Sequence, residues 1–266
     1  MGSSPQRSAD ARGWRAAGAD VASDAMRTTH PTLLSGPVVV GDDGSAGGAN
    51  ATAFASMLAS HVGLDVVPTH ADNGAGVPRS VDGAAHAAGA GLVVIGAHRR
   101  DNGGLPIGAT GDRLLHDARC PVAIVPAGWA EDPHPVRVVG VALDDRVESR
   151  HALVVGRELA ERAEAAIRII AVARPAAASG EEALVGVLHD AIRSLPAGLR
   201  ALPVLLHGDP AERLADETGK GLDVLVCGSR GYGPVGAALL GSVSRMLLRR
   251  SECPVLVVPR RAWAPV

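Results

Sequence analysis

Aromatic side chains are scarce in this chain, which has one Phe, one Tyr and three Trp among 266 residues. They are Phe54, Tyr232, Trp14, Trp129 and Trp263. Proteins that bind single-stranded nucleic acid stack bases on aromatic rings, and this chain offers few such platforms. The formal net charge of -2 also gives no general attraction for nucleic acid or for an anionic membrane. We therefore expect neither nucleic acid nor a membrane as a partner.

Cysteines and long apolar runs are also few. The three cysteines, Cys120, Cys227 and Cys253, are odd in number and form no C-x-x-C pair. This pattern suits a reducing compartment and predicts buried thiols rather than disulfides. No apolar run approaches the roughly 20 residues of a membrane-spanning helix, and the N-terminus lacks a signal-peptide pattern. The ten histidines show no metal-ligand spacing, so we expect no metal site, and we expect a cytoplasmic protein.

The apolar content of 47% is enough for two hydrophobic cores in a chain of this length. Residues 1–33 show no sustained hydrophobic period and are predicted to be a disordered arm. Residues 34–127 form a first domain, and residues 128–135, with one Gly and two Pro, form a linker. Residues 136–260 form a second domain. The prediction is therefore one arm and two domains.

Short apolar strands alternate with helices in both domains. Strands are expected at 38–40, 66–67, 92–95 and 121–125, and again at 136–143, 167–172, 202–206, 222–227 and 254–258. The segment from Asp209 to Glu212 resembles a capping box with proline at the first helical position, which predicts a helix from Pro210 to about Gly219. Because parallel neighbours need crossover connections, the chain is predicted to be α/β, with two doubly wound open parallel sheets.

The two domains look like copies of one another. The segment from Cys120 to Pro126 matches the segment from Cys253 to Pro259, and each is preceded by a Leu-Leu pair. The copies differ in length: Asp144 and Gly228 are 84 positions apart (228 minus 144), whereas Asp43 and Gly96 are 53 apart (96 minus 43). The first copy therefore lacks about one strand-and-helix crossover.

A glycine-rich segment of the second copy has the pattern of a phosphate site. It runs Gly228-Ser229-Arg230-Gly231, then nine residues, then Gly241-Ser242-Val243-Ser244. Glycine permits close approach of the backbone to a ligand, and a helix that begins at Gly241 presents unpaired amides at the positive end of its dipole. Such a helix start favours an anion without any lysine.

The spacing Gly-x2-Gly-x9-Gly-Ser strongly resembles the nucleotide motif of the universal stress protein family, and the resemblance covers about residues 38–260. It implies Rossmann-like sheets of the adenine nucleotide alpha hydrolase type, with strand order 3-2-1-4-5 and the ligand at the carboxyl ends of strands 1 and 4. It implies binding of ATP or a related adenine nucleotide, alone or with Mg2+. The implied binding residues are Ala142, Leu143, Asp144, Val172, Cys227, Gly228, Arg230, Gly231, Gly241, Ser242, Val243 and Ser244.

Several roles stay open from the sequence alone. Asp144 either shapes the nucleotide site or caps the following helix. Arg230 either reaches phosphate or lies on the solvated surface. In the first copy, Arg99 replaces the second motif glycine and Ala109 replaces Ser242, so this copy is either a weaker nucleotide site or a structural partner.

The resemblance implies a tandem universal stress protein that senses stress or energy state through the nucleotide. Strands 121–125 and 254–258 would pair within the chain as an intramolecular pseudo-dimer, and a homodimer of the whole chain is a further expectation. No Ser-His-Asp or paired-carboxylate arrangement predicts an enzyme. The alternatives are a slow nucleotide hydrolase or transferase on the same fold, and a ligand-free interaction module. The literal G-x-G-x-x-G at 231–236 follows a fourth strand rather than a first, which is the wrong context for a dinucleotide site.

Overall fold

A computed structural model describes residues 34–70, 77–98, 111, 114–115, 118–174, 178–229 and 241–259. The chain divides at Pro31, and the described residues all belong to the second of its two units, Thr32–Val266. The predicted N-terminal arm lies outside the described residues. Both copies belong to the second unit.

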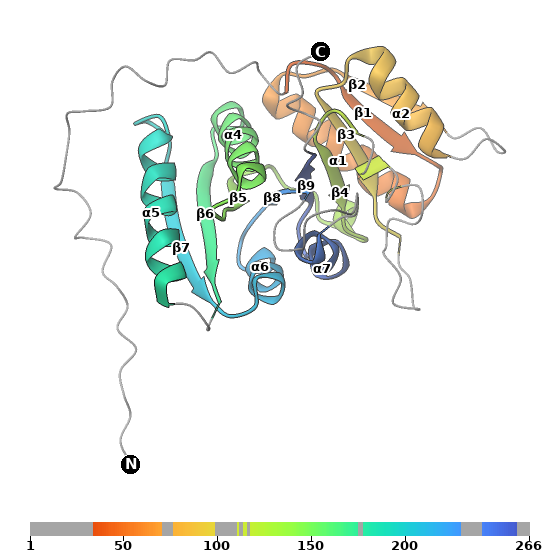
Figure 1. Cartoon of the computed structure of the whole chain (residues 1–266). Helices are drawn as coiled ribbons and strands as arrows, with labels where there is room; N and C mark the ends of the chain where they lie inside the picture. Colours follow the sequence, from red (N-terminus) through yellow and green to blue (C-terminus); the bar gives the residue numbers. More distant parts are fainter. Residues whose placement is uncertain are drawn as a thin grey trace. The chain divides into compact units, whose positions relative to one another are not determined.

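Helices and strands alternate in each copy as the pattern of short apolar runs predicts (Figure 1). The first copy comprises β1 (Val38–Asp42), α1 (Ala46–Val62), β2 (Val66–His70), α2 (Val77–Ala88), β3 (Leu92–Gly96) and β4 (Val122–Val125), and is followed by a short 3-10 helix, η1 (Trp129–Glu131). The second copy comprises β5 (Val138–Ala142), α4 (Val147–Arg162), β6 (Ala166–Ala173), α5 (Ala178–Ser194), β7 (Ala201–His207), α6 (Pro210–Thr218), β8 (Val224–Gly228), α7 (Ser242–Arg250) and β9 (Val255–Val258).

The strands form a single nine-stranded sheet in the order β2-β1-β3-β4-β9-β8-β5-β6-β7. Within the second copy the order is the predicted 3-2-1-4-5. Among the described residues the first copy has the same order without a third strand, as its shorter spacing predicts. The α/β class is confirmed. The two expected sheets are joined, however, because β4 and β9 pair antiparallel with Val122 opposite Val257. The other pairs among the described strands are parallel.

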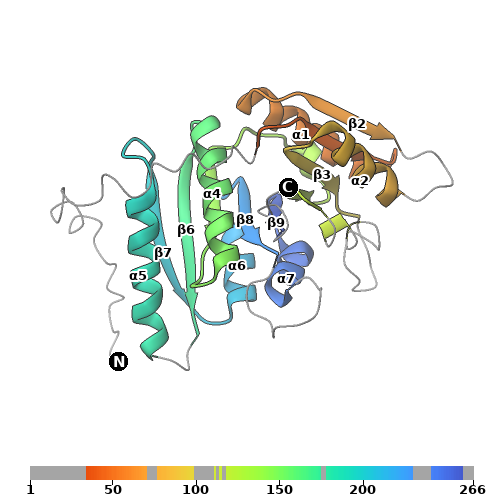
Figure 2. The ribbon, with the colours of Figure 1, turned by 45° about the horizontal axis from the view of Figure 1, so that its top comes forward.

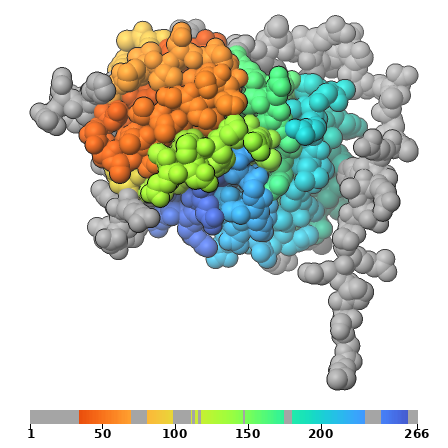
Figure 3. All heavy atoms as spheres, turned by 180° about the vertical axis from the view of Figure 1, so that it is seen from behind, coloured from red at the N-terminus to blue at the C-terminus, as the bar shows by residue number. Residues whose placement is uncertain are grey.

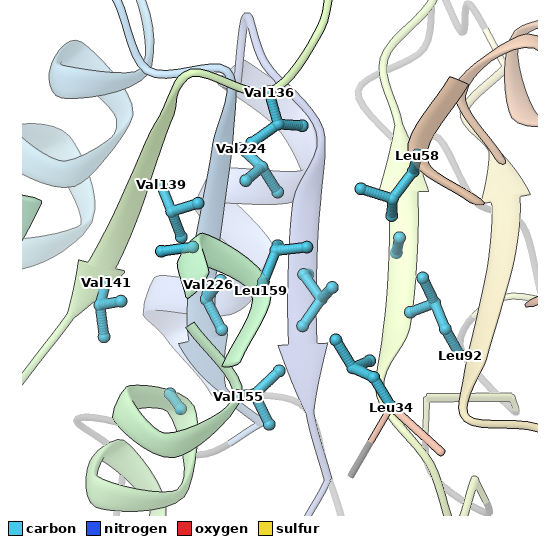
Figure 4. Close-up of a cluster of buried hydrophobic side chains, with 14 of the residues drawn as sticks. Leu34, Leu58, Leu92, Val136, Val139, Val141, Val155, Leu159, Val224 and Val226 are labelled. Carbon is cyan, nitrogen blue, oxygen red and sulfur yellow. The ribbon is translucent and has the colours of Figure 1, made fainter. Parts of the chain in front are cut away.

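Helices cover both faces of the sheet, as parallel strands require. Two buried clusters lie on the two faces: α1, α4 and α5 contribute to one, and α2, α6 and α7 contribute to the other (Figures 1 and 2). Figure 4 shows part of the first cluster, where Val139 and Val226 of the second copy lie beside Val155 and Leu159 of α4. These four side chains are fully buried, so the sheet that carries the site has a dry, rigid base.

The segment between the copies is held by specific contacts. Trp129 of η1 packs edge-on against Phe54 of α1, with ring centroids 5.2 Å apart, and Asn50 accepts a hydrogen bond from the Ala130 amide at 2.7 Å. On the other side, Asp223 accepts hydrogen bonds from the amides of Arg137 and Val138, at 2.7 Å each. In Figure 3 the yellow-green residues of this region lie along the orange first copy. The connection therefore packs against both copies.

Candidate functional site

The candidate site lies where the strand order of the second copy reverses. β5 pairs with β6 on one side and with β8 on the other, and the chain leaves β5 for α4 but returns from β8 to the opposite face through α7. In open α/β sheets a crevice forms at the carboxyl ends of the strands at this point. The second copy thus places a crevice beside Ala142 and Gly228, the last residues of β5 and β8.

Eight of the predicted binding residues line one pocket in this crevice: Ala142, Leu143, Asp144, Val172, Cys227, Gly228, Val243 and Ser244. Gly241 and Ser242 are the N-cap and first residue of α7, at the edge of the site. Arg230 and Gly231 lie outside the described residues. The pocket also contains three residues that the sequence did not indicate: Ser149 of α4, Ile170 of β6 and Leu214 of α6. Their apolar or small side chains fit the ordinary pattern of a core, so no signal marked them.

Asp144 is the most unusual group of the pocket because its carboxylate is almost completely buried, at 4% exposure. Its Oδ1 accepts a hydrogen bond from the Arg146 amide at 3.0 Å, whereas its buried Oδ2 has no hydrogen-bond partner. The Arg146 Nε lies 3.9 Å from Oδ2. Burial raises the pKa of Asp144, against the opposing effects of Ser149 and Arg146. An acceptor of this kind is costly to leave unsatisfied, so its position favours a ligand that donates to it.

The N-terminus of α7 forms the opposite wall. Gly241 caps this nine-residue helix without any side-chain hydrogen bond, and Val243 and Ser244 of the first turn line the pocket. The Ser244 hydroxyl donates to the Gly228 carbonyl at 3.1 Å, which ties the helix start to the end of β8. The first turn contains no acidic residue, and among the described residues no side chain caps it, so its positive dipole end faces the crevice. This is the geometry that the glycine-rich segment predicts for an anion site.

The inner wall of the pocket is apolar. Ile170, Val172 and Leu214 are each at most 2% exposed, and the thiol of Cys227 lies beside them. Burial raises the pKa of Cys227 to about 12, so the thiol is protonated at neutral pH and is not a nucleophile. The cavity has a volume of about 20 Å³, which holds roughly one water molecule. Small-molecule sites commonly measure about 300–1,000 Å³, so a nucleotide base enters only if this wall moves.

No three His, Cys, Asp or Glu side chains within the described part of the chain are grouped as a metal site. None of its helices is both long and apolar enough to cross a membrane.

An open parallel sheet with a crevice at its switch point defines a Rossmann-like α/β protein. A sequence profile of the Universal stress protein family matches residues 77–126 and 135–259, and the chain therefore belongs to that family, with one match in each copy. This confirms the resemblance that the glycine spacing indicates.

Individual relatives agree. The Universal stress protein in QAH/OAS sulfhydrylase 3'region of Thermus aquaticus is 39% identical over 85 residues, which cover 29% of this chain and 62% of that protein. The Universal stress protein YxiE of Bacillus subtilis is 29% identical over 142 residues, 44% of this chain and 95% of that protein. Among solved structures, a universal stress protein from Archaeoglobus fulgidus superposes with a TM-score of 0.56 and 21% identity, over 74% of this chain and 72% of that one. This last similarity shows the fold alone.

Proposed function

We propose that the second copy binds an adenine nucleotide, with ATP as the main ligand, and that occupancy of the pocket reports stress or energy state. Three parts of the pocket match three parts of the ligand. The apolar wall of Ile170, Val172 and Leu214 suits the adenine ring. The first turn of α7 suits the phosphates. Asp144 suits a ribose hydroxyl, or a Mg2+ ion that accompanies the phosphates.

The buried Oδ2 of Asp144 carries this proposal. A protein without a ligand here would keep in its core a charged oxygen that has only the distant Arg146 Nε, at 3.9 Å, and no hydrogen-bond donor, at a lasting cost in stability. Replacing the carboxylate by an apolar side chain would remove that cost, so a ligand that donates to Oδ2 explains why a carboxylate is useful at this position.

The small volume of the pocket supports a role in signalling. Because the cavity holds about one water, binding of adenine has to displace Leu214 or its neighbours on α6. If the wall has one position that admits adenine and one that does not, the ligand binds only the first and shifts the equilibrium toward it. Occupancy would then change the surface near α6, which a partner protein can detect.

We propose further that the protein is not an enzyme and that the β4 and β9 pairing forms an intramolecular pseudo-dimer, with a homodimer of the whole chain as a higher assembly. The thiol at the site is protonated, and the carboxylate of Asp144 is committed on one oxygen to Arg146. Multiple turnovers per minute of ADP release by purified protein would instead establish the hydrolase alternative.

Calorimetric titration with ATP tests the proposal directly. We expect saturable binding of ATP, with GTP as a control for the base and inorganic triphosphate as a control for the phosphates. Ala142→Phe fills the pocket from the end of β5 and should abolish binding while the fold is kept. Leu159→Val, in the core but outside the pocket, is the matched control and should bind ATP normally. A flat titration with wild-type protein at millimolar ATP would refute the proposal.

A further inference from the structure

We infer that one proline at each end of the sheet closes it to further strands, so that a second copy of this chain can dock only on helices or loops. The closure concerns assembly and does not depend on nucleotide binding. It follows from where proline lies in the sheet and from the direction in which its backbone nitrogen points.

Two strands form the ends of the sheet, β2 at one end and β7 at the other (Figure 2). Each pairs with a single neighbour among the described strands, β2 with β1 and β7 with β6. The final strands of the two copies, by contrast, pair with each other inside the sheet. The free side of an outer strand carries unpaired amides and carbonyls, to which another chain can add a strand. Association through strands would therefore occur at β2 or β7.

Of the nine described strands, only these two contain proline. Pro68 is the third residue of β2, and Pro203 is the third residue of β7. Proline has no N–H to donate, and its ring occupies the space that the N–H of another residue would leave to a partner. A strand that is paired on both sides rarely tolerates this loss, whereas an edge strand can.

The hydrogen bonds to β6 show which way the nitrogen of Pro203 points. In a parallel ladder the N–H and C=O of one residue point to the same side of the strand, and successive residues alternate. The Arg200 carbonyl accepts from the Ile167 amide at 2.8 Å, and the Gly208 amide donates to the Ala173 carbonyl at 2.9 Å. The even-numbered residues of β7 therefore face β6. The nitrogen of Pro203 faces the free side of the sheet.

The same geometry holds at β2. The Asp65 carbonyl accepts from the Val38 amide at 2.8 Å, so the odd-numbered residues of β2 face β1. Pro68 therefore also points to the free side. Each proline removes a donor near the middle of its edge and costs no hydrogen bond inside the sheet. A proline one position earlier or later would have interrupted the ladder instead.

The strand β7 has the stronger tendency to associate. Residues 201–206 carry no charge, and five of the six are Ala, Val or Leu. Leu202 is 52% exposed, which is unusual for a large apolar side chain in the described part of this chain. Short, uncharged and apolar segments on a sheet edge are typical aggregation sites, and proline within the segment prevents this. Pro203 therefore protects an edge that is otherwise suited to pairing.

Pro203→Thr tests the closure, because threonine supplies the missing N–H and favours strands. We expect the variant to associate through β7, with a mean mass in light scattering about twofold above wild type at the same concentration and a return to the wild-type mass on dilution. Pro196→Thr, the same substitution in the turn before β7, is the matched control and should keep the wild-type mass. Pro68→Thr tests β2 in the same way. A variant whose mass equals that of the control refutes the closure at that end.

Amide exchange keeps the closure testable if Pro203→Thr fails to fold. In the wild-type protein the Leu205 amide points to the free side and the Leu206 amide points to β6, by the same alternation. By NMR, Leu205 should exchange about tenfold or more faster than Leu206 at every protein concentration. Equally slow exchange at both amides, or protection of Leu205 that grows with concentration, would mean that another strand lies on β7 and would overturn the inference.

Discussion

Replacing Asp144 by asparagine should make the ligand-free protein more stable and the nucleotide complex weaker. The substitution keeps the shape of the side chain and its bond from the Arg146 amide to Oδ1, and it removes the charge of a residue that is only 4% exposed. An unsatisfied buried polar group costs about 1–3 kcal/mol, and an amide removes only part of this, so we expect a gain near 1 kcal/mol at pH 7. For a chain of this size that corresponds to roughly 2–4 °C in Tm.

The pH dependence of the stability difference between variant and wild type tests whether the charge of Asp144 causes this gain. Because burial raises the pKa of Asp144 in the folded state, ionisation destabilises the wild-type fold above that pKa. Below the unfolded value of 3.8 the carboxyl is neutral in both states, and the penalty disappears. The advantage of the variant should therefore be full at pH 7 and shrink as the pH falls toward 4, as measured by urea unfolding at each pH.

The same substitution should weaken ATP binding. A hydrogen bond to a charged acceptor contributes about 1.5–3 kcal/mol, so its loss predicts a Kd about 10- to 150-fold higher in calorimetry. Asp43→Asn is the matched control in the first copy. It keeps the Oδ1 acceptor but removes the charge that strengthens the bonds from Ser45 and attracts His98, so it should lower stability and leave the Kd unchanged. Because the pKa of Asp43 is lowered, its stabilising effect is present above 3.8 and is lost as the pH falls through the folded pKa. An Asp144→Asn protein that is less stable at pH 7, or that binds ATP like wild type, would refute the reasoning.

Three further substitutions test the fold. Glu164 follows the end of α4 with a φ of 52°, in the left-handed region that strains any residue other than glycine, and the equivalent residue of the first copy is Gly63. Glu164→Gly should therefore raise stability by about 0.5–1 kcal/mol in thermal unfolding. An unchanged or lower Tm would contradict the presence of strain at Glu164. Ser45→Ala removes the cap of α1 and should cost about 0.5–2 kcal/mol, whereas a loss below that range in urea unfolding would show the cap to be redundant. Asn50→Ala leaves the Ala130 amide unpaired and should cost about 1–3 kcal/mol in the same assay, and a smaller effect would mean that water replaces the bond.

The strand order is predicted by the resemblance to the family, whereas the strands themselves and the shortened first copy are predicted by patterns that repeat along the chain. The run at Val224–Gly228 is short, apolar and bounded by turn residues. The number of residues between Asp144 and this run indicates how many crossovers lie between the first strand and the fourth. The start of α6 at Pro210 is equally local, since Asp209 accepts from the amides two and three residues later. Features of this kind need no knowledge of tertiary packing.

The sequence predicts only part of the pocket. The motif places α7 and the end of β8, but Leu214 reaches the pocket from α6 on a different crossover, and its spacing matches that of any buried helix residue. The volume of the cavity and the missing partner of Asp144 Oδ2 depend on how these elements pack against one another. The hydrogen bonds of the turn at 42–45 could not be predicted from the sequence either, because they depend on how its carboxylates and amides are placed in the folded structure.

The antiparallel pairing of β4 with β9 has a consequence for assembly. When two copies of a fold share a sheet as separate chains, the fraction that is paired falls as the protein is diluted. Here η1 and residues 132–137 tether the two copies, so pairing is intramolecular and its effective concentration is fixed by the tether. The second copy therefore keeps the first copy beside it at any expression level, and the sequences of the two copies can diverge without loss of their pairing.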